Sequence, residues 1–190
     1  MSQQLSERPG CASARYLQLG RCTQAELEAL MRRGTRPDPQ ALAGWEYRGR
    51  NVAWWAERSP ILQFVKGSYR DPAGRVWGYN EPVRQDGGEE PWRALPSEEE
   101  PKRFGFYKVM PVDPAGRDNE YLQAVLLDYG RGRNPLWEPA RVLRDYLVRV
   151  DPDSDELLLG KAYLALGPAR VPTNFFLLER HRPTRWARVD

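Results

Sequence analysis

Several polar side chains of this chain stand inside segments that are otherwise apolar. Lys161 lies in LLLGKAYLAL, Glu179 in FFLLERH and Asp128 near the end of AVLLDYG. Burying such groups costs free energy unless each one is hydrogen-bonded or paired with an opposite charge. These segments therefore predict buried ion pairs or polar contacts to a bound molecule. The candidate ligand-binding residues are Trp54, Trp77, Asn80, Tyr107, Asp128, Arg144, Tyr146, Lys161 and Glu179.

The charged candidates allow two kinds of role. A desolvated lysine such as Lys161 could form a Schiff base or act as a base, and Glu179 in an apolar strand could act as a general acid or base. The alternative for both is a plain ion pair between neighbouring strands. Asp128 and Arg144 could likewise form a structural ion pair at the rim or anchor a ligand. Arg144 and Asp145 cannot both face inward, because successive residues of a strand point to opposite faces.

The sequence lacks the patterns of several other kinds of site. It has no Walker loop, dinucleotide fingerprint or metal-ligand spacing, so we expect no metal and no cofactor. The one histidine, His181, has nothing near it in sequence that suggests a Ser-His-Asp arrangement. Cys11 and Cys22 could form a disulfide that closes only a short loop.

Charge and hydropathy limit the partners. The 29 basic and 26 acidic residues are interleaved, which predicts no nucleic-acid partner. The strong excess of Arg over Lys is typical of a GC-rich bacterial genome. The start of the chain carries no basic-then-apolar run, and no stretch is long and apolar enough to span a bilayer. We therefore expect a cytoplasmic protein with no membrane partner.

The N-terminal part is predicted to be separate from the rest. Residues 1–22 are polar and aperiodic, and we expect an irregular arm there. A helix is predicted over 23–34, because Thr23 and Glu26 form a capping-box pattern before an apolar stripe. The predicted division is an N-terminal arm and helix over 1–42 and a β-barrel domain over 43–190.

From residue 44 onward the hydropathy pattern favours strands. The segment 85–102 is rich in Gly, Pro and acids and is predicted to be a long loop, with Trp92 packed back on the body. The sixth strand could pass for a helix on length alone. The eight predicted strands span 44–52, 61–70, 75–84, 103–112, 120–130, 141–150, 156–167 and 174–181.

The phrase DPAGR occurs twice, at 71–75 and 113–117. A type I turn followed by a left-handed glycine typically has Asp, then Pro, and then Gly three positions after the Asp. Such a turn joins antiparallel strands. We predict that the two copies close tight hairpins between the second and third strands and between the fourth and fifth. The segment DPDSD at 151–155 predicts a looser turn of the same kind.

Eight strands in sequence predict a mainly β fold, an eight-stranded antiparallel up-and-down β-barrel with an N-terminal helix. A closed barrel of this size is filled by side chains or holds one small ligand. The strand glycines Gly67, Gly78, Gly105 and Gly160 fit tight coiling and predict room inside. Several strands are apolar on both faces, so the outer face needs a cover: the 23–34 helix, the 85–102 loop or the second subunit of a homodimer.

The segment ALAGWEYRG resembles the start of lipocalin-type barrels, although Trp45 here directly follows Gly44 instead of fitting their Gly-x-Trp spacing. The phrases GYNEPV, FGFYKV, LLLGKAYLALG and FFLLER are similar to those of uncharacterised bacterial lipocalin-like, or calycin-type, barrels. The resemblance covers about residues 40–181. It implies a container fold without a particular ligand, and no catalytic residue is carried over from it.

Three functions fit this container. The first is binding of a small hydrophobic or aromatic molecule, with Trp54 and Trp55 at the mouth. The second is a cofactor-independent cyclase or isomerase that uses a Tyr, Asp, Glu or Lys for proton transfer on a small natural-product substrate. The third is an assembly protein whose apolar strands pack against a partner. The sequence leaves open whether the chain is an enzyme.

Overall fold

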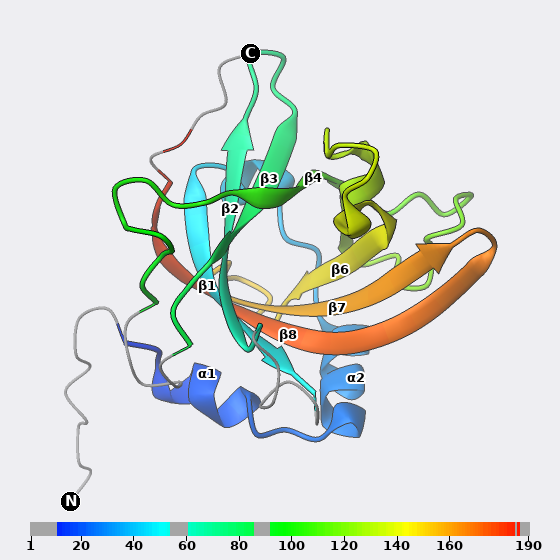
Figure 1. Ribbon diagram of the computed structural model, residues 1–190. Coiled ribbons are helices and arrows are strands. Elements are labelled where there is room, and N and C mark those ends of the chain that lie inside the picture. The colour runs from blue at the N-terminus through cyan, green and yellow to red at the C-terminus, as the bar shows by residue number, and fades with distance from the viewer. Residues whose placement is uncertain (1–10, 54–60, 86–91, 185, 187–190) are drawn as a thin grey trace, which may run out of the picture.

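A computed structural model describes residues 11–53, 61–85, 92–184 and 186. Eight antiparallel strands form a closed barrel in which each strand pairs with its neighbours in sequence and β1 pairs with β8 (Figure 1). The predicted mainly β, eight-stranded antiparallel barrel is confirmed. The strands are β1 (Trp45–Val52), β2 (Gln63–Arg70), β3 (Val76–Pro82), β4 (Phe104–Pro111), β5 (Val125–Asp128), β6 (Leu143–Arg149), β7 (Leu157–Leu166) and β8 (Ala169–Pro183).

Two strands differ from their predicted bounds by more than two residues at one end. Strand β5 is shorter than the predicted 120–130 at both ends. Before it the Ala124 N–H donates to the Tyr121 carbonyl (3.0 Å) in a turn, and after it the Asp128 side chain accepts from the Arg131 N–H (3.2 Å) and caps the 3₁₀ helix η2 (Tyr129–Arg131). Strand β8 is longer than the predicted 174–181, since β7 and β8 extend into a long hairpin closed at Gly167, whose φ is +56°. The sixth segment is a strand, preceded by the short 3₁₀ helix η3 (Pro139–Val142).

The two DPAGR turns close different connections. In the first, the Asp71 N–H donates to the Arg75 carbonyl (2.9 Å) and Gly74 has a φ of +76°, so the predicted tight hairpin between β2 and β3 is confirmed. In the second, the Gly116 N–H donates to the Asp113 carbonyl (3.0 Å), so the turn forms. The prediction of a tight hairpin there is wrong, because strand pairing stops at Pro111 and resumes only at Val125.

Three helices precede the barrel: α1 (Ala14–Leu19), α2 (Gln24–Arg33) and α3 (Pro39–Leu42). The capping box predicted for α2 is present. Helix α1 lies where an irregular arm was expected, since Ser13 caps it by accepting from the Tyr16 N–H (3.2 Å). With only six residues it is too short to show a helical period in the sequence.

The N-terminal helices and the loop around Trp92 cover part of the outer face of the barrel (Figure 1). Tyr16 packs edge-on against Trp92, and the Trp92 indole N–H donates to the Gly49 carbonyl (3.0 Å). Leu27 and Met31 of α2 join the same outer hydrophobic cluster. Two of the three covers that the sequence suggested, the helix and the long loop, therefore lie on this face.

The strand glycines make room for aromatic rings. A Cβ atom at Gly78 would lie 2.2 Å from the ring of Tyr107, and one at Gly160 would lie 2.0 Å from the ring of Phe176. Both rings belong to the hydrophobic core inside the barrel. The expectation that these glycines leave the interior open is therefore wrong at these two positions, where the space is filled by the neighbouring strand's ring.

Replacing Gly78 by Ala is expected to lower the free energy of unfolding by about 1–3 kcal/mol, because the buried Tyr107 ring must move to admit a methyl group. Gly20→Ala is the control, since a Cβ there meets only ordinary contacts. Urea unfolding of both variants measures the effect. Equal stability of Gly78→Ala and Gly20→Ala would contradict this account of the glycine.

Candidate functional site in the barrel interior

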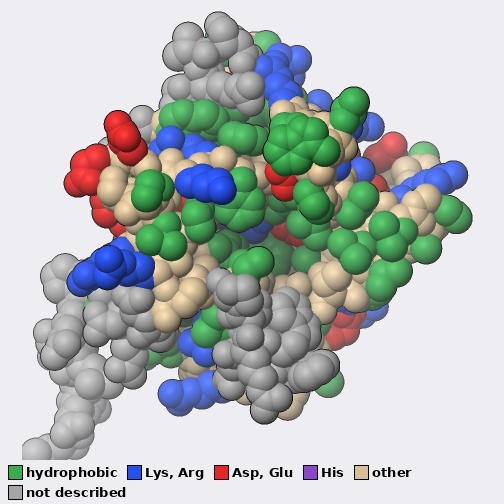
Figure 2. Space-filling view, viewed as in Figure 1, with side chains coloured by type: hydrophobic (Ala, Val, Ile, Leu, Met, Phe, Trp, Pro, Cys, Tyr) green, Lys and Arg blue, Asp and Glu red, His purple; other side chains and the backbone are tan. Residues whose placement is uncertain are grey.

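The barrel interior contains a cavity of about 340 Å³. Figure 2 shows a hollow with mainly hydrophobic side chains near the middle of the face that it presents. On the other side of Lys66 the barrel interior is filled by packed side chains, among them Tyr107, Leu127 and Leu158. The cavity is lined by Asn51, Ile61, Phe64, Lys66, Asn80, Phe104, Tyr129, Ala140, Leu143, Asp145, Ala162, Thr173, Asn174 and Phe176.

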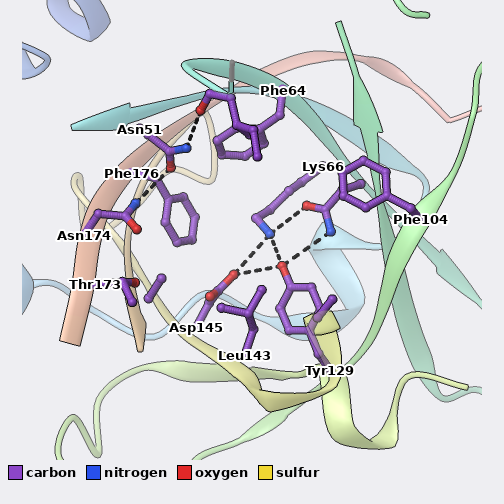
Figure 3. A pocket seen from close by; sticks show the side chains of 14 residues that line it. Asn51, Phe64, Lys66, Phe104, Tyr129, Leu143, Asp145, Thr173, Asn174 and Phe176 are labelled. Carbon is purple, nitrogen blue, oxygen red and sulfur yellow. Dashed lines mark hydrogen bonds and ion pairs between the residues drawn. The ribbon is translucent and has the colours of Figure 1, made fainter. Parts of the chain in front are cut away.

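Four of these lining residues form one polar cluster (Figure 3). Lys66 Nζ lies 3.1 Å from Asp145 Oδ2 and donates hydrogen bonds to Asn80 Oδ1 (2.9 Å) and to the Tyr129 hydroxyl. The Tyr129 hydroxyl in turn donates to Asp145 Oδ2 (3.0 Å). The Asn80 amide also donates to the Gly105 carbonyl (2.8 Å). The cluster is therefore an internally hydrogen-bonded Lys–Asp ion pair.

Strand pairing explains why these residues meet. Lys66 on β2 is the register partner of Asn80 on β3. Asp145 on β6 pairs with Leu127 on β5, and Tyr129 follows two residues later in η2. Because the barrel closes, β2 and β6 present side chains to the same enclosed space. The four polar side chains thus come from four different segments of the chain.

The cluster is almost completely removed from solvent: Lys66 is 4% exposed and Asp145 is 3% exposed. The ammonium lies 5.0–5.6 Å from the ring centroids of Phe64, Tyr107, Tyr129 and Phe176, so cation–π attraction adds to the ion pair. Burial lowers the pKa of Lys66, and the Asp145 carboxylate opposes that shift.

Burial and the adjacent Asp145 carboxylate also act on Tyr129, whose pKa they raise well above its ordinary value. The phenol therefore keeps its proton at neutral pH and remains a hydrogen-bond donor to Asp145. What the arrangement offers chemically is a protonated phenol, an ammonium and a carboxylate within hydrogen-bonding distance of one another.

A β-bulge shapes the rim of the cavity. The register of β7 with β8 shifts between Ala162, which pairs with Asn174, and Tyr163, which pairs with Pro172. Thr173 is the extra residue, so Thr173 and Asn174 both line the cavity although they are neighbours in sequence. The Asn174 amide donates to Asn51 Oδ1 (2.8 Å), which ties β8 to β1 at the rim.

Of the predicted ligand-binding residues, Asn80 lines the cavity. Tyr107 lies in the packed layer beneath it, and its hydroxyl donates to the Gly67 carbonyl (3.1 Å). Trp77 lies on the outer face, where its indole N–H donates to Asp71 Oδ2 (2.9 Å). Trp54 falls outside the described residues.

The remaining predicted residues lie away from the cavity. Asp128 and Arg144 are register partners and form an ion pair of 3.1 Å between Oδ1 and Nε, so the expected contact is present and structural. Arg144 and the inward-facing Asp145 point to opposite faces, as strand geometry requires. Tyr146 belongs to the outer core, with its ring 5.3 Å from that of Tyr163.

Lys161 and Glu179 do not pair with each other, although the sequence suggested that they could. Lys161 Nζ lies 2.8 Å from Glu28 Oε2 on α2. Glu179 accepts from the Ser13 N–H (3.1 Å) before α1 and lies 3.5 Å from Arg48 Nε. The strand register sets Lys161 opposite Phe175 instead. Both residues therefore bind the N-terminal helices to the outside of the barrel.

The residues at the centre of the cluster were not among the predicted ligand-binding residues. Lys66 stands in ILQFVKGSYR, an apolar segment as marked as the one around Lys161. Tyr129 and Asp145 are also polar residues in apolar segments of the sequence, beside Asp128 and Arg144, but neither was predicted to bind a ligand. The same signal could have found Lys66, but it does not tell which residues of a segment face the barrel interior.

Comparison with known proteins does not assign this chain to a family. No protein-family model matches this chain, and no significant match to a curated protein was found. The lipocalin-like resemblance therefore remains a prediction, and the finding is an eight-stranded antiparallel barrel.

Three further observations bear on other predicted features. Cys11 and Cys22 are both free thiols. Among the residues described, no helix is both long and apolar enough to cross a lipid bilayer. Within that same part of the chain, no group of three His, Cys, Asp or Glu side chains is placed to hold a metal ion.

Removing the charge of Lys66 alone is expected to destabilise the protein strongly. Lys66→Met leaves the Asp145 carboxylate buried without its cation, which should cost about 3 kcal/mol or more. The double variant Lys66→Met, Asp145→Asn keeps an acceptor for the Tyr129 hydroxyl and should recover a large part of that loss. Urea unfolding of both variants measures this coupling. A double variant no more stable than Lys66→Met would show that the ion pair is not the source of the effect.

Proposed function

We propose that this chain binds one small, largely apolar molecule inside the barrel. The observation that carries the proposal is a cavity of about 340 Å³ whose walls are mainly aromatic and aliphatic and whose inner end holds a compact polar cluster. An apolar cavity with a few convergent polar groups is the ordinary form of a small-molecule site. The walls supply the affinity, and the cluster orients the ligand.

The distribution of polar groups supports a ligand with one polar end. Phe64, Phe104, Leu143 and Phe176 line the cavity together with the cluster, and burying an aromatic or aliphatic group against them is favourable. The polar cluster around Lys66 lies on one side of the space (Figure 3). A hydrophobic or aromatic molecule that carries one polar substituent matches this arrangement.

Filling the cavity tests the proposal. Ala162 lines it, so Ala162→Phe should occupy the ligand's space and weaken binding of the neutral fluorophore N-phenylnaphthylamine by about tenfold or more, or about 1.4 kcal/mol. Ala169→Phe, at an exposed position at the start of β8, is the matched control and should bind like the wild type. Fluorescence titration measures both. Equal binding by the two variants, or no binding by the wild-type protein, would contradict the proposal.

A second candidate is a cofactor-independent cyclase or isomerase in the same cavity. The observation that favours it is the hydrogen bond from the protonated Tyr129 phenol to Asp145 Oδ2 (3.0 Å) beside the Lys66 ammonium. Such a group can transfer or share a proton with a reacting oxygen at a position largely shielded from solvent. Tyr129→Phe separates the candidates: a carrier keeps most of its affinity, whereas an enzyme stops converting the molecule that it binds.

A further inference from the structure

The hydrogen-bonding capacity of the cluster is almost completely used within it. The Lys66 ammonium has three donors and three partners: Asn80, Tyr129 and Asp145. The Tyr129 hydroxyl donates to Asp145 Oδ2, and the Asn80 amide donates to the Gly105 carbonyl. The Asn80 amide also donates to the Tyr129 hydroxyl (3.4 Å), so the donors of these four residues are all used within the part of the chain that the structure describes.

One acceptor is left over. All contacts of the Asp145 carboxylate run through Oδ2, and Oδ1 receives no hydrogen bond from any residue that the structure describes. The side chain is 3% exposed, and it lines the cavity with Lys66 and Tyr129 gathered at its other oxygen (Figure 3). Oδ1 is not among the fully buried atoms that lack a partner, so it borders the open cavity, and a ligand that covered it without donating a hydrogen bond would leave a charged oxygen unsatisfied at a cost. A ligand that donates one would remove this cost.

Charge narrows the ligand class further. Lys66 and Asp145 neutralise each other, and they are the charged residues among those that line the cavity. A ligand carboxylate placed at the cluster would face the Asp145 carboxylate and find no free donor in the cluster, since the unpaired hydroxyl of the lining belongs to Thr173 on β8. A ligand ammonium would leave a net positive charge in a low-dielectric space that already holds the Lys66 ammonium. A neutral ligand avoids both costs.

From these contacts we infer that the ligand is a neutral apolar molecule bearing a hydroxyl or N–H group, which donates to Asp145 Oδ1 at the inner end of the cavity. Phenols, alcohols and indole-like compounds belong to this class. Fatty acids and other carboxylates do not. The inference rests on the proposed function, because it specifies the ligand of the same cavity.

The test is a matched series on one carbon skeleton, titrated by calorimetry at neutral pH into the wild-type protein. Para-phenylphenol keeps the donor, para-phenylanisole replaces the donor by a methyl ether, and para-phenylbenzoate adds a negative charge. The phenol is expected to bind about tenfold more tightly than the ether, as a hydrogen bond to a charged acceptor predicts. The benzoate is expected to bind more weakly than the phenol.

Each other result is informative. Equal affinity of the phenol and the ether, or stronger binding of the benzoate, overturns the inference while the proposed function stands. Failure of all three compounds, together with failure of N-phenylnaphthylamine, overturns both.

A variant pair checks the atom involved. Asp145→Asn can turn an amide N–H toward the cavity, and it should abolish or reverse the preference for the phenol over the ether. Asp153→Asn is the control: it makes the same substitution at an exposed position outside the cavity lining, and it should keep the preference for the phenol. A preference unchanged in a folded Asp145→Asn protein would contradict the assignment to Asp145.

Discussion

The barrel encloses the Lys66–Asp145 ion pair, and the arrangement of its interior depends on the hydrogen bonds and ring contacts that these two buried charges need. Taking the two charges out of water is unfavourable unless their attraction and their hydrogen bonds compensate. Asn80 and Tyr129 supply those bonds, and four aromatic rings surround the ammonium. The rings and the cluster take up one end of the interior, and the open space that remains is the apolar cavity.

The outside of the barrel is stabilised by a separate set of contacts. Tyr16, Trp92 and the α2 side chains cover the outer apolar faces, while Lys161 and Glu179 bind the helical segments through Glu28 and the Ser13 N–H. These polar residues support the fold from outside and do not reach the cavity. Charged residues in apolar strands thus serve two purposes in this molecule, one on each face of the sheet.

The repeated turns and apolar strands were enough to predict the barrel, but they could not give the phase of each strand. In β2 every residue from Gln63 to Tyr69 is buried, so the alternation that normally separates inner from outer side chains is absent. For the same reason Arg144 was predicted to bind the ligand, although Asp145 is the residue that faces the cavity. Lys161 was likewise predicted in place of Lys66. Asn80 was predicted as a polar residue inside an apolar segment, and the strand register sets it beside Lys66. The phase of these strands is set by packing between segments distant in sequence.

Native mass spectrometry of the protein purified gently from its own cells tests whether the barrel holds a small molecule. We expect a bound organic molecule that is neutral, carries a hydroxyl or N–H group and is released on denaturation. That molecule should be absent from Ala162→Phe prepared in the same way. A wild-type protein that carries no small molecule and binds none of the neutral aromatic probes would contradict the account.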